Sequence, residues 1–297
     1  MAQSCASKPL AVTMGEPAGI GAEILLKAWS EDQHHSHQLP LLYVIDQKDR
    51  LCTLNSALGL GVSCVAIDDP SEVWEAAKHG LPVLTPTGWD DDAIAQVQLG
   101  TPTPATAEAV LESIRIGVEH TVAGQAAGLV TLPIQKSVLQ EAGFAFPGHT
   151  EFLGHLTEDE PLEGDMPRGP IMMLGTETFK TVPVTVHRPL SEVPAALTHD
   201  LIVKTGLITA KSLEHHFGLA NPRLAVAGLN PHAGEEGRIG HEDRAIIQPA
   251  VENLLAAGID AVGPLPADTM FHEEARERYD AALCMYHDQA LIPIKTI

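Results

Sequence analysis

The sequence has 297 residues, of which 44% are hydrophobic and 4% aromatic, so aliphatic side chains supply most of a buried core. Lysine and arginine number 18 against 39 aspartates and glutamates, and the formal net charge is −21. Nucleic acid and anionic membrane surfaces repel a chain this acidic, so we expect neither as a partner. It also repels phosphorylated ligands, so any phosphate site must be a local island of positive groups.

Four cysteines, none of them in a CxxC pair, suggest no disulfide framework and favour a reducing compartment. No apolar run reaches the ~18 residues that a membrane span needs. The polar first residues, 1–9, lack the apolar segment of a signal peptide. We therefore expect a cytoplasmic protein.

Short apolar runs and amphipathic stretches alternate in the first part of the chain. They predict strands over residues 10–14, 39–45 and 62–67, and helices over residues 22–29 and 49–58. The glycines at 15, 19 and 21 follow the first strand with the spacing GxxxGxG instead of GxGxxG. We therefore predict a structural turn, or a loop lining a cleft, and not a dinucleotide-binding loop.

Residues 68–105 are rich in proline, glycine, threonine and aspartate, which predicts a long irregular connection. The helix predicted over 106–123 follows, because Val110, Ile114 and Val118 recur every four residues.

The rest of the chain repeats the alternation. It predicts strands over 128–132, 171–174, 182–186, 224–229, 260–263 and 281–286, and helices over 198–217 and 242–257. Strands alternating with helices of this length indicate an α/β fold with much parallel sheet. We expect two α/β subdomains, residues 1–126 and 127–297.

Three of the fifteen histidines stand directly after predicted strands: His187, His232 and His287. The carboxyl ends of parallel strands converge on the ligand crevice of an open α/β sheet. Three imidazoles and a water would form an open metal site of the catalytic kind. The alternative is that these histidines cap loops through hydrogen bonds.

Two acids share this placement. Asp268 and Asp288 also follow predicted strands, where they would orient the imidazoles or relay protons. Ordinary turn capping explains both equally well.

Residues 148–151 form a short polar tip in which His149 and Thr150 offer an imidazole and a hydroxyl to an anion. A helix start capped by Thr150 is the alternative. Lys136 and Lys295 each follow an apolar stretch containing proline, and in so acidic a chain they are candidate phosphate ligands, although most lysines are simply solvated.

Five blocks of the sequence together resemble the 4-hydroxythreonine-4-phosphate dehydrogenase family. They occur in the family's order over essentially the whole chain, which makes the match specific. The blocks are GEPAGIG (15–21), PGHTEF (147–152), LNPHAGE (229–235), GPLPADT (263–269) and MYHDQ (285–289).

The resemblance implies a fold like that of isocitrate and isopropylmalate dehydrogenases, with two subdomains flanking a cleft, and a homodimer with a shared active site. It implies that His187, His232 and His287 bind a divalent metal, which is zinc or alternatively magnesium, cobalt or manganese. It implies that His149, Thr150 and Lys295 contact the phosphorylated substrate. Its catalytic positions match Asp268 and Asp288, and we add Lys136 to them.

The family reaction is oxidation of 4-phosphooxy-L-threonine by NAD or NADP, followed by loss of carbon dioxide. The product, 3-amino-2-oxopropyl phosphate, is a precursor of pyridoxal phosphate. A metal is chemically suited to this sequence of steps, because it lowers the pKa of a hydroxyl and stabilises enolate charge. Relatives continue for some tens of residues beyond residue 297, so we expect the return of the chain to the first subdomain to be missing.

Three alternatives remain open. A dehydrogenase of D-threonate or D-erythronate 4-phosphate would use the same metal and phosphate residues. An acyltransferase on a related fold would need no metal. A non-catalytic, metal-stabilised scaffold would bind metal without a nicotinamide.

Overall fold

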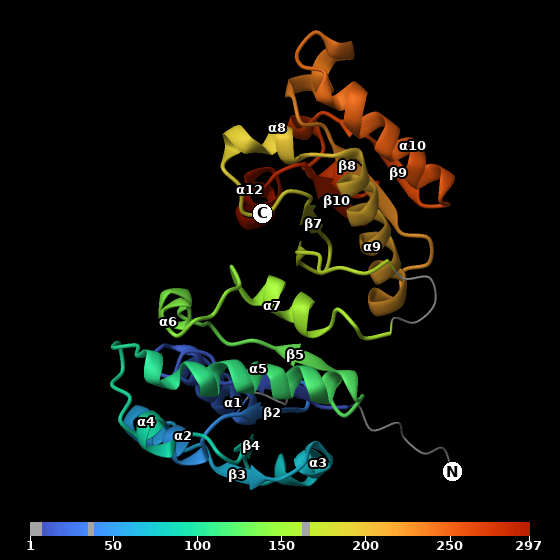
Figure 1. Ribbon diagram of the computed structural model, residues 1–297. Coiled ribbons are helices and arrows are strands. Elements are labelled where there is room, and N and C mark those ends of the chain that lie inside the picture. The colour runs from blue at the N-terminus through green and yellow to red at the C-terminus, as the bar shows by residue number, and fades with distance from the viewer. Residues whose placement is uncertain (1–7, 35–38, 162–166) are drawn as a thin grey trace, which may run out of the picture. The chain divides into compact units, whose positions relative to one another are not determined.

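The computed structural model describes residues 8–34, 39–161 and 167–297. The chain folds as two compact units that divide between Glu160 and Pro161 (Figure 1). This division comes later than the subdomain boundary expected between residues 126 and 127, because the next strand still joins the sheet of the first unit. Cys5 lies outside the described residues, and Cys52, Cys64 and Cys284 are free thiols.

A five-stranded sheet with the order β3-β4-β2-β1-β5 forms the centre of the first unit. Its strands are β1 (Leu10–Thr13), β2 (Leu42–Ile45), β3 (Cys64–Ile67), β4 (Leu81–Leu84) and β5 (Gly128–Val130). Every pairing in this sheet is parallel. Parallel strands need crossover connections, and the helices of the unit supply them.

Helices cover both faces of this sheet because successive strand residues point to opposite sides. Ala11 packs in the apolar cluster that includes Ile114, whereas its neighbour Val12 packs in the cluster of Leu26 and Leu51. Burying one such leucine or isoleucine contributes ~1.5–3 kcal/mol. The helices are α1 (Gly21–His34), α2 (Lys48–Leu58), α3 (Val73–Ala76), α4 (Asp91–Ala95), α5 (Ala107–Val122), α6 (Lys136–Glu141) and α7 (His149–Leu156).

The irregular connection predicted over residues 68–105 is wrong in one respect, because it contains β4 together with α3 and α4. All four residues of β4 are buried, and the strand lies between β2 and β3. The pattern misses it because Pro82 argues against an interior strand. The sheet tolerates Pro82 since β4 pairs with β2 only from Val83 onward.

A second five-stranded sheet, with the order β6-β7-β10-β8-β9, forms the centre of the second unit. Its strands are β6 (Leu174–Gly175), β7 (Lys180–Pro183), β8 (Arg223–Ala227), β9 (Asp260–Leu265) and β10 (Ala281–Cys284). All pairings are parallel except that of β6 with β7. The strand predicted over 182–186 begins and ends earlier, although Val184 still donates its N–H to Cys284, the last residue of β10, and Thr185 donates to the next residue, Met285.

Helices α9 and α10 cover one face of the second sheet, and α12 covers the other. The long helix predicted over 198–217 is confirmed, and it ends at Gly218 in the left-handed conformation that favours glycine. The helix predicted over 242–257 begins with a π-helical turn, Asp243–Ile247. The helices are α8 (Val193–Ala196), α9 (His199–Phe217), α10 (Gln248–Ala256), α11 (Glu273–Arg276) and α12 (His287–Thr296).

Both units are thus helices packed on a largely parallel sheet, which confirms the predicted α/β class. Among the described residues, no helix has the length and apolar character needed to cross a bilayer.

Candidate active site

The three histidines singled out from the sequence follow neighbouring strands of the second sheet. His187 comes after β7, His287 begins α12 directly after β10, and His232 lies in the turn after β8. The order β7-β10-β8 is continuous and its pairings are parallel. All three histidines therefore follow the carboxyl edge of the sheet, where ligands of open α/β folds bind.

His187 and His287 are brought close together, with ring centroids 5.5 Å apart and an angle of 45° between the planes. The backbone explains this approach. Thr185 donates its N–H to the carbonyl of Met285 at 3.2 Å and its hydroxyl to the same oxygen at 2.6 Å. The segment leading to His187 is therefore fastened to the segment leading to His287.

A cavity of about 250 Å³ opens beside these two rings. Its lining includes Arg188 and Leu190 as well as Tyr286 and Asp288. Arg188 was not singled out as a site residue. A cation directly after a candidate ligand, in a chain of net charge −21, is the signal that points to it.

An Asp288 carboxylate oxygen accepts a hydrogen bond from Nδ1 of His287 at 2.8 Å. A carboxylate on one ring nitrogen fixes the tautomer and leaves the lone pair on Nε2, an arrangement also found in carboxylate–histidine pairs at metal sites. The Asp288 side chain is 69% exposed and that of His287 33% exposed, so both are open to solvent.

His232 lies in a turn, Pro231–Gly237, with an unusual backbone. Residues 232–236 all have positive φ, including 53° at His232 and 51° at Ala233. Left-handed backbone is unfavourable for residues with a Cβ, so surrounding contacts must hold this turn. The imidazole of His232 is exposed.

The structure does not bring these three histidines together into one metal-binding group. Within residues 8–34, 39–161 and 167–297, no three histidine, cysteine, aspartate or glutamate side chains form a group that could hold a metal ion. His187 and His287 lie ring to ring, whereas His232 belongs to no such group. The donor types and their shared strand edge nevertheless fit a divalent metal.

Asp268 and Lys295 occupy different places in the second unit. Asp268 is exposed in the short 3-10 helix after β9, and so follows the same carboxyl edge. Lys295 is exposed in the last turn of α12, roughly 12 Å along the helix axis from His287. Lys295 and His287 are therefore suited to different groups of a ligand.

In the first unit, His149 begins α7, and Gly148 is the N-cap residue without a side-chain hydrogen bond. The helix start is as predicted, but Thr150 as its cap is wrong, since the exposed Thr150 is already inside the helix. Nε2 of His149 is buried and has no hydrogen-bond partner. Burial, and secondarily the charge of Lys136, holds the pKa of His149 below its usual range.

Lys136 is the first residue of α6, and its ammonium group approaches Gly148 closely. A Cβ at position 148 would lie 3.1 Å from Nζ of Lys136, so the missing side chain makes room for this lysine. Lys136 and His149 thus form a small positive or polar island, which an acidic chain needs to accept a phosphate.

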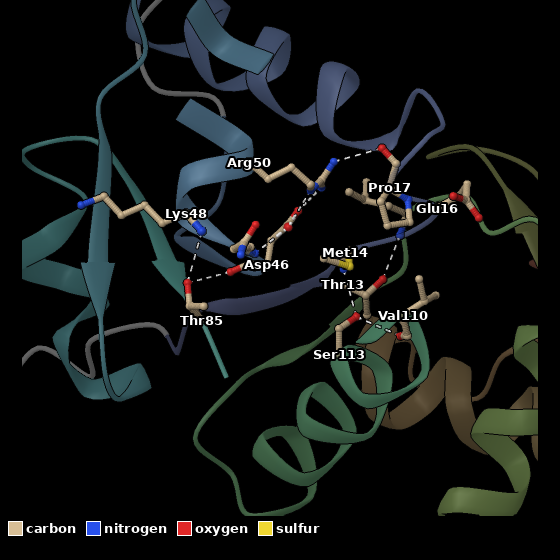
Figure 2. Close-up of polar contacts among 12 residues, drawn as sticks. Thr13, Met14, Glu16, Pro17, Asp46, Lys48, Arg50, Thr85, Val110 and Ser113 are labelled. Atoms are coloured by element: carbon tan, nitrogen blue, oxygen red, sulfur yellow. Dashed lines mark hydrogen bonds and ion pairs between the residues drawn. The ribbon is translucent and has the colours of Figure 1, made fainter. Parts of the chain in front are cut away.

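The glycine-rich loop after β1 is held by buried charges (Figure 2). The Arg50 guanidinium forms an ion pair with Asp46 and donates to the carbonyl of Pro17 at 3.2 Å. Glu16 accepts the N–H of Ala18 at 3.0 Å. Asp46 is fully buried and its carboxylate is paired with Arg50, so it is not free to bind a ribose. This supports the prediction of a structural turn and not of a dinucleotide loop.

Comparison with known proteins identifies the family. A sequence model described as the pyridoxal phosphate biosynthetic protein PdxA matches residues 40–297. The chain belongs to this family. The resemblance inferred from the five sequence blocks is thereby confirmed.

The relatives of this PdxA-family chain are named alike. A 4-hydroxythreonine-4-phosphate dehydrogenase from Caulobacter vibrioides is 47% identical over 291 residues, covering 98% of this chain and 83% of that protein. One from Bradyrhizobium diazoefficiens is 47% identical over 300 residues, covering 98% and 84%. The crystal structure of one from Klebsiella pneumoniae matches with a TM-score of 0.83 and 33% identity, covering 98% of this chain and 85% of that chain.

Proposed function

We propose that the chain oxidises 4-phosphooxy-L-threonine with NAD or NADP and releases carbon dioxide to give 3-amino-2-oxopropyl phosphate. The observation that carries this proposal is 47% identity over 98% of the chain to a protein named for that substrate. The carboxyl edge of the second sheet, with its three histidines, supplies residues of the right chemistry.

His187, His232 and His287 are the proposed metal ligands. The 5.5 Å between the rings of His187 and His287 supports a shared ligand, and His232 completes the set from the adjacent strand. When bound, a divalent metal would lower the pKa of the substrate hydroxyl and stabilise negative charge on the ketone oxygen. Zinc suits three imidazoles and a water, and magnesium, cobalt and manganese are alternatives.

Two carboxylates handle the protons in this proposal. Asp288 accepts from Nδ1 of His287 and thereby keeps Nε2 as the nitrogen with a lone pair for the metal. Asp268 accepts the proton of the substrate hydroxyl. A bound nicotinamide would accept the hydride from the carbon that carries this hydroxyl. The ketone formed there would lie β to the carboxylate, and such a β-keto acid readily loses carbon dioxide.

The proposed phosphate ligands are cationic and polar side chains. The buried, unpartnered Nε2 of His149 is available to a phosphate oxygen, and Thr150 lies beside it at the start of α7. Lys136 adds its charge there and is a proton donor to a substrate bound at His149. Lys295, in the last turn of α12, is a further proposed phosphate ligand.

We further propose a cytoplasmic homodimer in which the two subunits share the active site. The three free cysteines among the described residues support a reducing compartment.

The test is NAD(P)H formation from 4-phosphooxy-L-threonine, with and without added Zn²⁺, Co²⁺, Mn²⁺ or Mg²⁺. We expect metal-dependent turnover that His232→Ala reduces by at least about 100-fold, since it removes a ligand. His216→Ala, at the exposed end of α9, is the matched control and should act like the unaltered chain.

Other outcomes lead elsewhere. Turnover of D-threonate or D-erythronate 4-phosphate but not of 4-phosphooxy-L-threonine would replace the substrate and keep the site. Metal binding without nicotinamide binding would favour the scaffold. Activity that survives both chelation and His232→Ala would refute the metal assignment.

A further inference from the structure

We infer that Asp243 and Gln289 are positioning residues whose side chains hold together the chain segments after β8 and β10, which lead to His232 and His287. We call these joined segments, residues 228–230 and 285–289, the platform. This inference rests on the proposed function, because it concerns how two proposed metal ligands are held. Neither residue is itself a proposed ligand. Their side chains are buried, with exposures of 2% for Asp243 and 8% for Gln289.

Asp243 holds the segment that leads to His232. One carboxylate oxygen accepts the N–H of Leu229 at 2.7 Å. The other accepts the N–H of Asn230 at 3.2 Å and the Asn230 side-chain amide at 2.8 Å. A buried carboxylate needs such donors, and here all of them belong to two consecutive residues just before the turn.

The turn that follows needs this support. Its backbone is left-handed from His232 through Glu236, which residues with a Cβ adopt only when the surroundings impose it. The side chains of Asp243 and Asn230 are also closely packed against neighbouring glycines. A Cβ at Gly228 would lie 2.7 Å from Oδ1 of Asp243, and one at Gly240 would lie 2.4 Å from the amide nitrogen of Asn230.

Gln289 links the two strand exits. Its Oε1 accepts the N–H of Met285, just after β10, at 2.6 Å. Its Nε2 donates to the carbonyl of Gly228, just after β8, at 2.7 Å. The backbone pairing of these strands ends at Leu283 and Val226, so the glutamine side chain continues the connection where the ladder stops.

The two side chains act on one short stretch of backbone. Gln289 holds Gly228, and Asp243 holds the next two residues, Leu229 and Asn230. Gln289 also lies in the first turn of α12, the helix that His287 begins. A displacement at Gln289 therefore reaches the segments of both histidines.

The experiment compares Asp243→Asn and Gln289→Met with Gln248→Met, a control in which an exposed glutamine of α10 loses only a bond to Glu252. The first measurement is the Kd for Co²⁺ on the substrate-free chain, by competition with a chelator. Positioning residues around metal ligands typically contribute 10–100-fold in affinity, and we expect about that loss in both variants. Gln248→Met should bind Co²⁺ as the unaltered chain does.

The second measurement is amide hydrogen exchange across residues 228–240 without metal. We expect faster exchange there in Gln289→Met, although the altered residue is distant in the sequence. In a double variant with Asp243→Asn and Gln289→Met, the increase in exchange should be smaller than the sum of the increases in the two single variants. Residues 107–122 should exchange as before, which separates a local effect from general unfolding.

The two readouts also separate this inference from the proposed function. If the unaltered chain binds no metal, the proposed metal chemistry fails, and the exchange data alone then decide whether the platform exists. Unchanged exchange over residues 228–240 in both variants would overturn the inference whatever the metal data show. Faster exchange with unchanged Co²⁺ affinity would overturn the positioning role and leave a purely structural one.

Discussion

The two five-stranded sheets use their carboxyl edges in opposite ways. After β1 and β2 of the first sheet, Glu16 and Asp46 are buried and the Arg50 side chain is 9% exposed. Each of them contacts another of the three or a backbone group (Figure 2). After β7 and β8 of the second sheet, His187 and His232 are exposed. Polar residues at a strand end are therefore not enough to mark a site. Their burial and pairing decide whether they stabilise a loop or remain available to a ligand.

The largest expected effect is the loss of stability when the ion pair between Arg50 and Asp46 is broken. Arg50→Ala leaves Asp46 as an uncompensated buried charge, which typically lowers the free energy of unfolding by about 3–5 kcal/mol. Urea unfolding measures this loss. Lys27→Ala removes an ion pair of the same i,i+4 spacing, but its side chains are 51% and 36% exposed, so we expect about 0.5 kcal/mol or less. Equal losses in the two variants would contradict the comparison.

At the carboxyl edge of the second sheet we expect the reverse, with a large effect on metal binding and a small one on stability. Asp288→Asn removes the carboxylate from His287, and we expect about 10–100-fold weaker binding of Co²⁺ with a stability change within about 0.5 kcal/mol. Asp200→Asn is the matched control, because Asp200 contacts Nδ1 of His199 at the same 2.8 Å at the start of α9. A stability loss in Asp288→Asn without loss of metal affinity would mean that Asp288 stabilises the fold and does not serve a metal site.

The smallest effect concerns His149. Burial is the larger cause of its lowered pKa and Lys136 the smaller, so Lys136→Met should raise the pKa but leave it below 6.5. NMR titration of the His149 ring measures this, with Lys27→Met as control. An unchanged pKa would show that the ammonium group does not act on His149.

The same shift fixes the sign of the pH dependence. Because the folded-state pKa of His149 lies below the unfolded value near 6.5, the unfolded chain binds the proton more readily. The contribution of His149 to stability is therefore complete above that pH and falls as the pH decreases below it. Lys136→Met should make this fall shallower.

Local signals made much of the fold predictable. Helices α5 and α9 lie within one residue of their predicted bounds, because apolar residues recur with helical spacing and Gly218 ends the second of them. Short strands were less accessible. β4 has only four residues, and one of them, Pro82, argues against an interior strand. Only the assembled sheet shows that β4 pairs with β2 from Val83 onward, so that Pro82 is tolerated.

The site was predictable where it depends on strand ends. His187 and His287 meet because their strands are neighbours, which the rule about carboxyl ends anticipates. The approach of Lys136 to Gly148, and the roles of Asp243 and Gln289, depend on how separate segments pack, with Gln289 and Gly228 61 residues apart in the sequence. No spacing in the sequence reports such contacts.

The position of β10 within the second sheet has a consequence for how the unit is made. Among the described residues it follows the other four strands of this sheet in the sequence, but it is the middle one in space, between β7 and β8. Since synthesis runs from the N-terminus, β7 and β8 leave the ribosome before the strand that joins them exists. The edges that β10 pairs with in the folded unit therefore lack this partner until β10 emerges, and the segments that carry His187 and His232 acquire their common neighbour only then.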